Sequence, residues 1–299
     1  MSHNHHHSTS SIKVAFWLNF TFTIIEIIGG FYTNSIAILS DALHDFGDTI
    51  ALGLAWFLEK FSKKKRDKRY SYGYGRFSLL AAFINGLILL LGSIFILYEA
   101  IPRLFNPVQP DANGMMWLAI GGIIFNGAAV YKMQSGKTQN EKIVSWHLME
   151  DVLGWVAVFI GSLIMKFWNV PIVDALLSVG FTLFILVNVF KNFLATVRIF
   201  LQAIPTNINE NEIVKEVIKL AHIKSAHDTH LWSIDGEKIV FTLHVVVDPN
   251  LTEKEVIEIK KSIRLIGSKY KVHHITVEVE FEQEDCGLEE CLKKQKALL

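Results

Sequence analysis

Two histidine–aspartate pairs with the same spacing lie in the apolar first two thirds of the chain. His44 and Asp48 are four residues apart, and His147 and Asp151 repeat that spacing. Side chains four residues apart share one face of an α-helix, with Cβ atoms about 5–6 Å apart. Two such faces packed together offer two imidazole nitrogens and two carboxylate oxygens, which suits tetrahedral Zn²⁺. The pairs therefore predict a metal site built from two helices.

Further ionisable residues accompany these pairs inside apolar segments. Carboxylates and imidazoles dominate there, with almost no Lys or Arg, which indicates that a bound cation supplies the counter-charge. Asp41 shares the face of His44 one turn earlier, and two roles stay open for it: a structural one, or orienting His44 and relaying protons. A structural role is the preferred interpretation for the other isolated carboxylates, namely Glu26, Asp45, Glu99 and Asp174.

Six apolar stretches are long enough to place these residues in a membrane. A span takes about 20 mostly apolar residues, and the candidates are 12–32, 35–58, 77–101, 114–133, 143–167 and 172–196. The linkers after the second and fourth spans are rich in Lys, whereas the opposite loops are poor in positive charge. Counting positive charges therefore places both termini in the cytoplasm.

Composition separates this membrane part from a second domain. Residues 1–205 are about 14% charged and residues 206–299 about 32% charged, within a chain that is 51% hydrophobic. That composition excludes a disordered or collagen-like chain. The formal net charge of zero gives no support for nucleic-acid binding. Two cysteines, Cys286 and Cys291, are too few for a disulfide framework.

The polar second part predicts a small two-layer domain. Residues 210–222 have the period of an amphipathic helix, and residues 224–233 and 238–247 read as a hairpin around a turn at Asp235–Gly236. Thr252 and Glu255 form a capping box before a second helix of about 15 residues. Residues 272–281 alternate as a third strand. The order α-β-β-α-β predicts an α+β domain.

Three stretches resemble the cation diffusion facilitator family: residues 33–48, 72–86 and 146–154 are similar to its second, third and fifth helices. The resemblance is closest to bacterial zinc-efflux members. It implies a homodimer in the bacterial inner membrane, and a Zn²⁺/H⁺ antiporter rather than an enzyme. It puts the transported ion on His44, Asp48, His147 and Asp151. The implied segments are a His-rich start (1–11), a six-helix transmembrane domain (12–205), a cytoplasmic α+β domain for metal binding and dimerisation (206–285) and a Cys-containing tail (286–299).

The resemblance also implies metal sites outside the membrane. One is a cytosolic zinc site at His227, His244, His273 and Glu280. His273 and Glu280 lie on opposite faces of an ideal strand, so they share an ion only if the chain turns or bulges, or they serve different ions. His230 and His274 are interpreted as supporting or exposed residues. A second site, at the tail, would join thiolates and imidazoles of Cys286, Cys291, His5, His6 and His7. The alternative is that these segments are solvated and bind no shared ion.

The proposed chemistry couples metal to protons. Imidazole and carboxylate bind Zn²⁺ only when deprotonated, so Zn²⁺ and protons compete for one site. The leading hypothesis is export of Zn²⁺ in exchange for H⁺, with cytosolic zinc modulating the dimer. The alternative is a membrane zinc sensor without turnover, which would share every ligand. Ligands at membrane depth favour transport. Zn²⁺ is preferred over Co²⁺, Ni²⁺, Fe²⁺ and Cd²⁺, all of which stay open.

Overall fold

The computed structural model describes residues 5–62, 64–134, 139–282 and 284. The chain divides into two compact units. The first comprises Met1–Lys60 and Leu80–Leu194, and the second comprises Phe61–Leu79 and Ala195–Leu299. The loop between the second and third helices falls in the second of these units.

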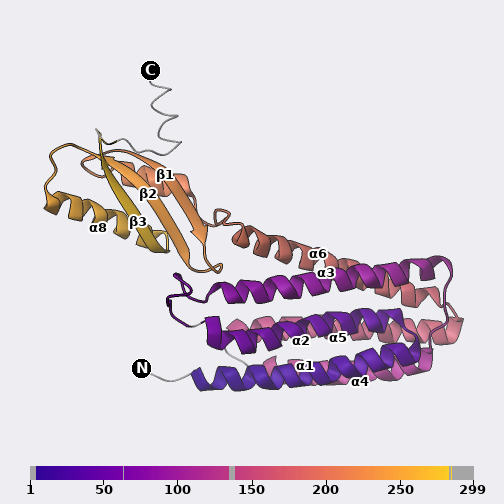
Figure 1. Cartoon of the computed structure of the whole chain (residues 1–299). Coiled ribbons are helices and arrows are strands. Elements are labelled where there is room, and N and C mark those ends of the chain that lie inside the picture. Colours follow the sequence, from indigo (N-terminus) through magenta and orange to yellow (C-terminus); the bar gives the residue numbers. More distant parts are fainter. Residues whose placement is uncertain (1–4, 63, 135–138, 283, 285–299) are drawn as a thin grey trace. The chain divides into compact units, whose positions relative to one another are not determined.

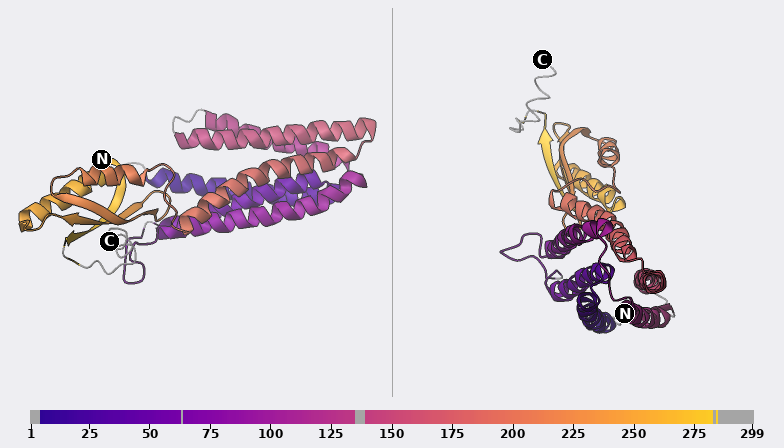
Figure 2. Two further views of the ribbon diagram at one scale, coloured as in Figure 1. Left: turned by 90° about the horizontal axis from the view of Figure 1, so that it is seen from above. Right: turned by 90° about the vertical axis from the view of Figure 1, so that its right-hand side faces the viewer.

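Within the described residues, six long helices run beside one another (Figures 1 and 2). They are α1 (His5–Thr33), α2 (Ile36–Ser62), α3 (Arg76–Phe105), α4 (Ala112–Gln134), α5 (Gln139–Trp168) and α6 (Ile172–Phe200). Judged on the described part of the chain, three segments are both long and apolar enough to cross a membrane: Arg76–Phe105, Met149–Trp168 and Ile172–Phe200. The predicted helical membrane domain is confirmed.

The first unit buries many polar side chains alongside its apolar core and exposes large apolar side chains on its exterior. Its buried polar side chains include Glu26, Ser40, Asp45, Thr49, Asp174, Ser178 and Thr182. Its outward-facing large apolar side chains include Phe31, Tyr98, Trp117, Tyr131, Phe167 and Phe184. In lipid, apolar surface carries no penalty, and helices associate through packing and hydrogen bonds between polar side chains. This distribution is therefore the one expected of helices surrounded by lipid.

Hydrogen bonds link α2 to its neighbours. The Asn19 side-chain amide on α1 donates to the Thr49 hydroxyl at 3.0 Å, and the Ser40 and Thr182 hydroxyls join α2 to α6 at 2.7 Å. Asp174 in the first turn of α6 caps the start of α2, accepting from the Ser35 hydroxyl at 2.5 Å and the Ile36 N–H at 2.8 Å. The structural role predicted for Asp174 is confirmed.

The second unit is a mixed α+β domain with the predicted element order. It contains α7 (Glu210–Ile218), β1 (Ile223–Ser233), β2 (Ile239–Val247), α8 (Glu253–Lys269) and β3 (Val272–Phe281). β2 is the central strand, antiparallel to β1 and parallel to β3 (Figure 1). The capping box predicted at Thr252 and Glu255 is present. Helix α7 ends at Ile218, four residues before the predicted end, and the chain then turns, with Leu220 N–H donating to Val217 O and His222 at φ of 69°.

Alternation along β2 separates the core of this domain from its metal-ligand candidates. Phe241, Leu243 and Val245 are buried and pack with side chains of α7 and α8. The intervening residues, among them His244, are half-buried. Because neighbouring side chains of a strand point to opposite faces, His244 lies on the face turned away from both helices.

Candidate metal-binding sites

A β-bulge in β1 shapes the histidine cluster of the second unit. His227 pairs with His244 and His230 pairs with Thr242, so three steps along β1 oppose two steps along β2. Asp228 lies inside the bulge with φ of 46°, a left-handed conformation that Asp tolerates better than most residues. A bulge re-aims the side chains around it. His227 and Asp228 therefore both reach His244, although they are consecutive in the chain.

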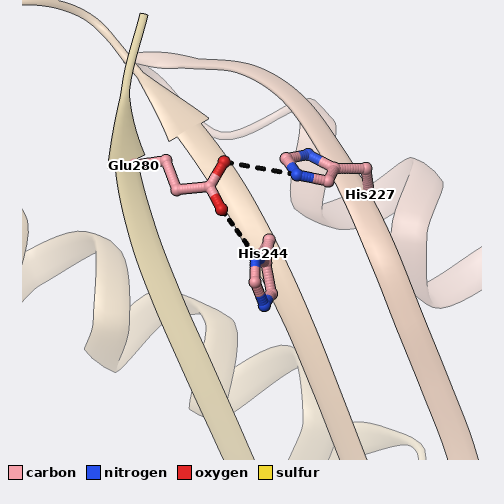
Figure 3. A group of neighbouring side chains, drawn as sticks. All are labelled: His227, His244 and Glu280. Atoms are coloured by element: carbon pink, nitrogen blue, oxygen red, sulfur yellow. Dashed lines mark hydrogen bonds and ion pairs between the residues drawn. The ribbon is translucent and has the colours of Figure 1, made fainter. Parts of the chain in front are cut away.

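Glu280 on β3 completes the cluster (Figure 3). Its Oε1 lies 2.5 Å from His244 Nδ1, and its Oε2 lies 3.2 Å from His227 Nε2. The three side chains are 10–14% exposed. The parallel register pairs Glu280 with Val246, which lies two residues beyond His244 and therefore on the same face. Three strands thus contribute one side chain each.

The donor set suits a zinc ion. One candidate ligand atom from each of His227, His244 and Glu280 lies within 4.8 Å of the others. Zinc–ligand bonds of about 2.0–2.1 Å at tetrahedral angles put two ligands about 3.3 Å apart. The separation of 3.2 Å between His227 and Glu280 matches that value, whereas the 2.5 Å between His244 and Glu280 is that of a direct hydrogen bond. Three protein ligands leave one position of a tetrahedral ion for water or another group.

His273 lies apart from this cluster. It stands at the start of β3, where its Nδ1 accepts a hydrogen bond from the Ile239 N–H at 3.3 Å. Glu280 lies seven residues further along the strand, a distance of about 23 Å at 3.3 Å per residue. Of the four residues expected at one cytosolic site, the structure brings three together within one chain.

The membrane unit places the first histidine–aspartate pair as expected. His44 Nε2 lies 3.8 Å from Asp48 Oδ2 on α2, and both side chains are about one quarter exposed. His147 and Asp151 lie on α5, but the side chain of His147 is outside the described residues. The described side chains therefore present three of the four expected ligands.

The acidic face of α2 is turned toward α5. Asp41 Oδ1 lies 4.0 Å from the position that a Cβ of Gly154 would take, and Asp41 interacts electrostatically with Asp151. Glu26, only 1% exposed, interacts with Asp45 and Asp41. Four carboxylates from three helices therefore gather inside the unit, an arrangement that favours a cation.

The expected tail site falls outside the part of the chain that the structure describes. This holds for Cys286 and Cys291 and for the side chains of His5, His6 and His7. Sequence reasoning also missed two aspartates that the structure singles out, Asp67 and Asp228. A signal for Asp228 was present, because it stands between His227 and His230.

Asp67 organises the basic loop between α2 and α3. It accepts hydrogen bonds from the Tyr74 hydroxyl at 2.7 Å and from the N–H groups of Arg69 and Tyr70 at 2.8 and 3.0 Å. These bonds, the one from Tyr74 above all, lower the pKa of Asp67 to about 2. One carboxylate thus accepts three hydrogen bonds within a loop that is otherwise rich in positive charge.

Comparisons with known proteins cover nearly the whole chain. Residues 12–201 match the model of the cation efflux transmembrane domain, and residues 205–282 match that of the cation efflux protein cytoplasmic domain. The chain is 33% identical to the metal cation efflux system protein CzcD of Cupriavidus metallidurans, over 95% of this chain and 92% of that protein. It is 32% identical to the cadmium, cobalt and zinc/H(+)-K(+) antiporter of Bacillus subtilis, over 94% and 93%.

Two further similarities concern a whole transporter and a separate domain. The zinc transporter ZitB of Pectobacterium atrosepticum is 30% identical, over 95% of this chain and 91% of that protein. Among solved structures, the metal-bound C-terminal domain of the CzcD transporter is 30% identical with a TM-score of 0.22, and the match covers 24% of this chain and 99% of that domain.

Proposed function

The chain belongs to the cation efflux family, and from this premise we propose that it exports Zn²⁺ from the cytoplasm in exchange for H⁺. It is a membrane protein of a family that transports metal cations. The choice of zinc, the proton exchange and the individual ligands are the proposal. The names of its relatives, a zinc transporter and a cadmium, cobalt and zinc antiporter, support the metal and the exchange.

The observation that carries the proposal is the group of acids and imidazole between α2 and α5. His44 and Asp48 share one face of α2, and Asp41 on the same helix interacts with Asp151 of α5. We assign the transported ion to His44, Asp48, His147 and Asp151. Two nitrogens and two carboxylate oxygens would replace the hydration shell of the ion.

Proton coupling follows from the chemistry of these ligands. Imidazole and carboxylate must lose their protons to hold the metal, so a site open to the cytoplasm loads Zn²⁺. A site open to a more acidic exterior gains protons and releases the ion. Each returning proton carries one charge down the membrane potential, which supplies about 2.3 kcal/mol per 100 mV. The positive linkers favour a bacterial inner-membrane orientation with both termini in the cytoplasm.

The cluster of His227, His244 and Glu280 is proposed as a cytosolic zinc site that modulates a homodimer. The match of residues 205–282 to the family's cytoplasmic domain supports this assignment. Zinc bound there can shift a conformational equilibrium only by the difference in its affinity for the two states. His273, Cys286, Cys291 and the N-terminal histidines stay predictions as ligands.

Zinc uptake into proteoliposomes with an imposed pH gradient tests the transport proposal. The comparison is between the wild-type chain, Asp151→Asn and Glu150→Gln. Glu150 is the exposed neighbour of Asp151 on α5, so it controls for loss of one charge at the same depth. We expect gradient-driven uptake in wild type and Glu150→Gln, and none in Asp151→Asn. Zinc binding without gradient-driven uptake by folded wild-type protein would contradict the proposal and favour a sensor.

A further inference from the structure

His244 has two ring nitrogens with different surroundings. Its Nδ1 points at Glu280, while the other nitrogen points away from that carboxylate (Figure 3). That second nitrogen, Nε2, lies 3.5 Å from Asp228 Oδ2 and 3.4 Å from Glu278 Oε2. An ion shared by His227, His244 and Glu280 would bind His244 through Nδ1. Nε2 then carries the ring proton and faces two carboxylates.

We infer that Asp228 is a positioning residue for zinc at this cytosolic site, acting through His244. The inference rests on the proposed function of the His227–His244–Glu280 cluster. Histidines that bind metal commonly donate their other N–H to a carboxylate, which fixes the tautomer and the ring orientation and makes the ligand nitrogen more basic. Asp228 supplies such a carboxylate without being one of the ligands.

The bulge is the device that brings Asp228 to this position. In a regular strand Asp228 would face away from His227, on the helix-covered side of the sheet. The extra residue in β1 and the φ of 46° at Asp228 put both side chains beside His244. Left-handed backbone at a residue with a Cβ costs free energy. The site gains an acceptor for Nε2–H in return.

Asp228 is better placed for this role than Glu278. Its side chain is 20% exposed, whereas that of Glu278 is 66% exposed. The other oxygen of Asp228, Oδ1, lies 3.2 Å from Nε2 of His230, which holds the carboxylate from its outer side. Glu278 has a longer side chain that faces water, so ordering it costs more conformational entropy and gains a weaker interaction.

Zinc titration of the full-length chain in detergent, against a competing chelator, tests the inference. The cytosolic site is identified as the binding step that His227→Ala removes. Asp228→Gly deletes the carboxylate while keeping a residue suited to positive φ, and Asp228→Asn keeps an uncharged acceptor. Glu278→Gln is the matched control, because it alters the other carboxylate near the same nitrogen. We expect Asp228→Gly to weaken this step about 10–100-fold, in line with partners of metal-binding histidines. Asp228→Asn should fall between Asp228→Gly and wild type, and Glu278→Gln should stay within about threefold of wild type.

A spectroscopic readout separates positioning from a purely structural role. In chain labelled with ¹⁵N-histidine, zinc-loaded His244 should show a protonated Nε2 protected from exchange with water. Asp228→Gly should expose that proton while the other strand resonances stay in place. An unchanged zinc affinity in Asp228→Gly, an equal loss in Glu278→Gln, or an unaltered Nε2 signal in Asp228→Gly would each overturn the inference. If His227→Ala removes no binding step from the wild-type titration, the proposed cytosolic site itself is wrong.

Discussion

Removing the carboxylate of Asp174 should destabilise the membrane unit through α2, the helix that carries His44 and Asp48. Asp174 is 1% exposed and accepts from the Ser35 hydroxyl and from the N–H groups of Ile36 and Ala37. The first N–H groups of a helix have no partner inside the helix. Because Ser35, Ile36 and Ala37 are buried, water cannot readily replace the missing acceptor. Asp174→Ala therefore leaves donors of the first turn of α2 buried and unpaired.

The size of the effect follows from the groups left without partners. A buried donor without an acceptor costs about 1–3 kcal/mol, and loss of a helix cap costs about 1 kcal/mol, up to about 2. These costs overlap, because fraying of one turn relieves several donors together. We expect the free energy of unfolding to fall by about 2–4 kcal/mol in Asp174→Ala. Asp174→Asn keeps an acceptor of the same shape and should lose about half as much.

Denaturant unfolding of the purified chain in detergent, followed by helical circular dichroism, measures this loss. Asp111→Ala is the control, because Asp111 caps the exposed start of α4, accepting from the Asn113 N–H at 3.1 Å. Water can replace that exposed bond, so the control should lose about 0.5–1 kcal/mol. Equal losses in Asp174→Ala and Asp111→Ala would refute the reasoning, since they would mean that burial of the cap adds nothing.

Three other outcomes are expected. Gly122→Ala should destabilise the first unit by about 1–3 kcal/mol in the same unfolding assay, because its new Cβ would overlap the ring of Trp155. Gly121→Ala is the control: a Cβ there meets no described atom within 4 Å, so this variant should be neutral or stabilising. The pKa of Asp67 is about 2, below its ordinary 3.8, so its hydrogen bonds hold above about pH 4 and are lost as the pH falls toward 2. The protection of the loop amides between α2 and α3, measured as exchange rates relative to the intrinsic rate at each pH, should therefore stay constant from pH 7 to 5 and fall only in more acidic buffer; a loss of protection already at pH 6 would be incompatible with this assignment. Glu280→Gln should abolish the zinc-binding step of the second unit while leaving basal zinc transport in proteoliposomes, and complete loss of transport would contradict the separation of the two sites.

Patterns local in sequence predicted most of the fold. Helical spacing placed His44 beside Asp48, and the Thr252 capping box marked the start of α8, because both depend on residues within one turn. The strand expected at 238–247 is present as Ile239–Val247. These features are set by backbone periodicity, which the sequence displays directly.

Features that depend on distant partners or on unusual backbone conformations were not predictable in the same way. The cap of α2 by Asp174 joins residues almost 140 positions apart, so sequence alone indicated a structural role without its partner. The bulge at Asp228 depends on a single residue with positive φ, which residue type alone does not specify. His273 was grouped with Glu280 by family pattern, but strand length keeps the two apart in one chain.

The parallel pairing of β2 with β3 has a consequence for synthesis of the chain. β2 reads IVFTLHVVV, without proline or a formal charge, and its β3 partner begins about 25 residues after it ends. At about 5–20 residues per second, β2 waits roughly 1–5 s on the ribosome with one edge unpaired. Such an edge is a template for pairing with another chain. A nascent or truncated chain that stops in α8 should therefore aggregate through β2, which makes β3 a determinant of yield as well as the strand that carries Glu280.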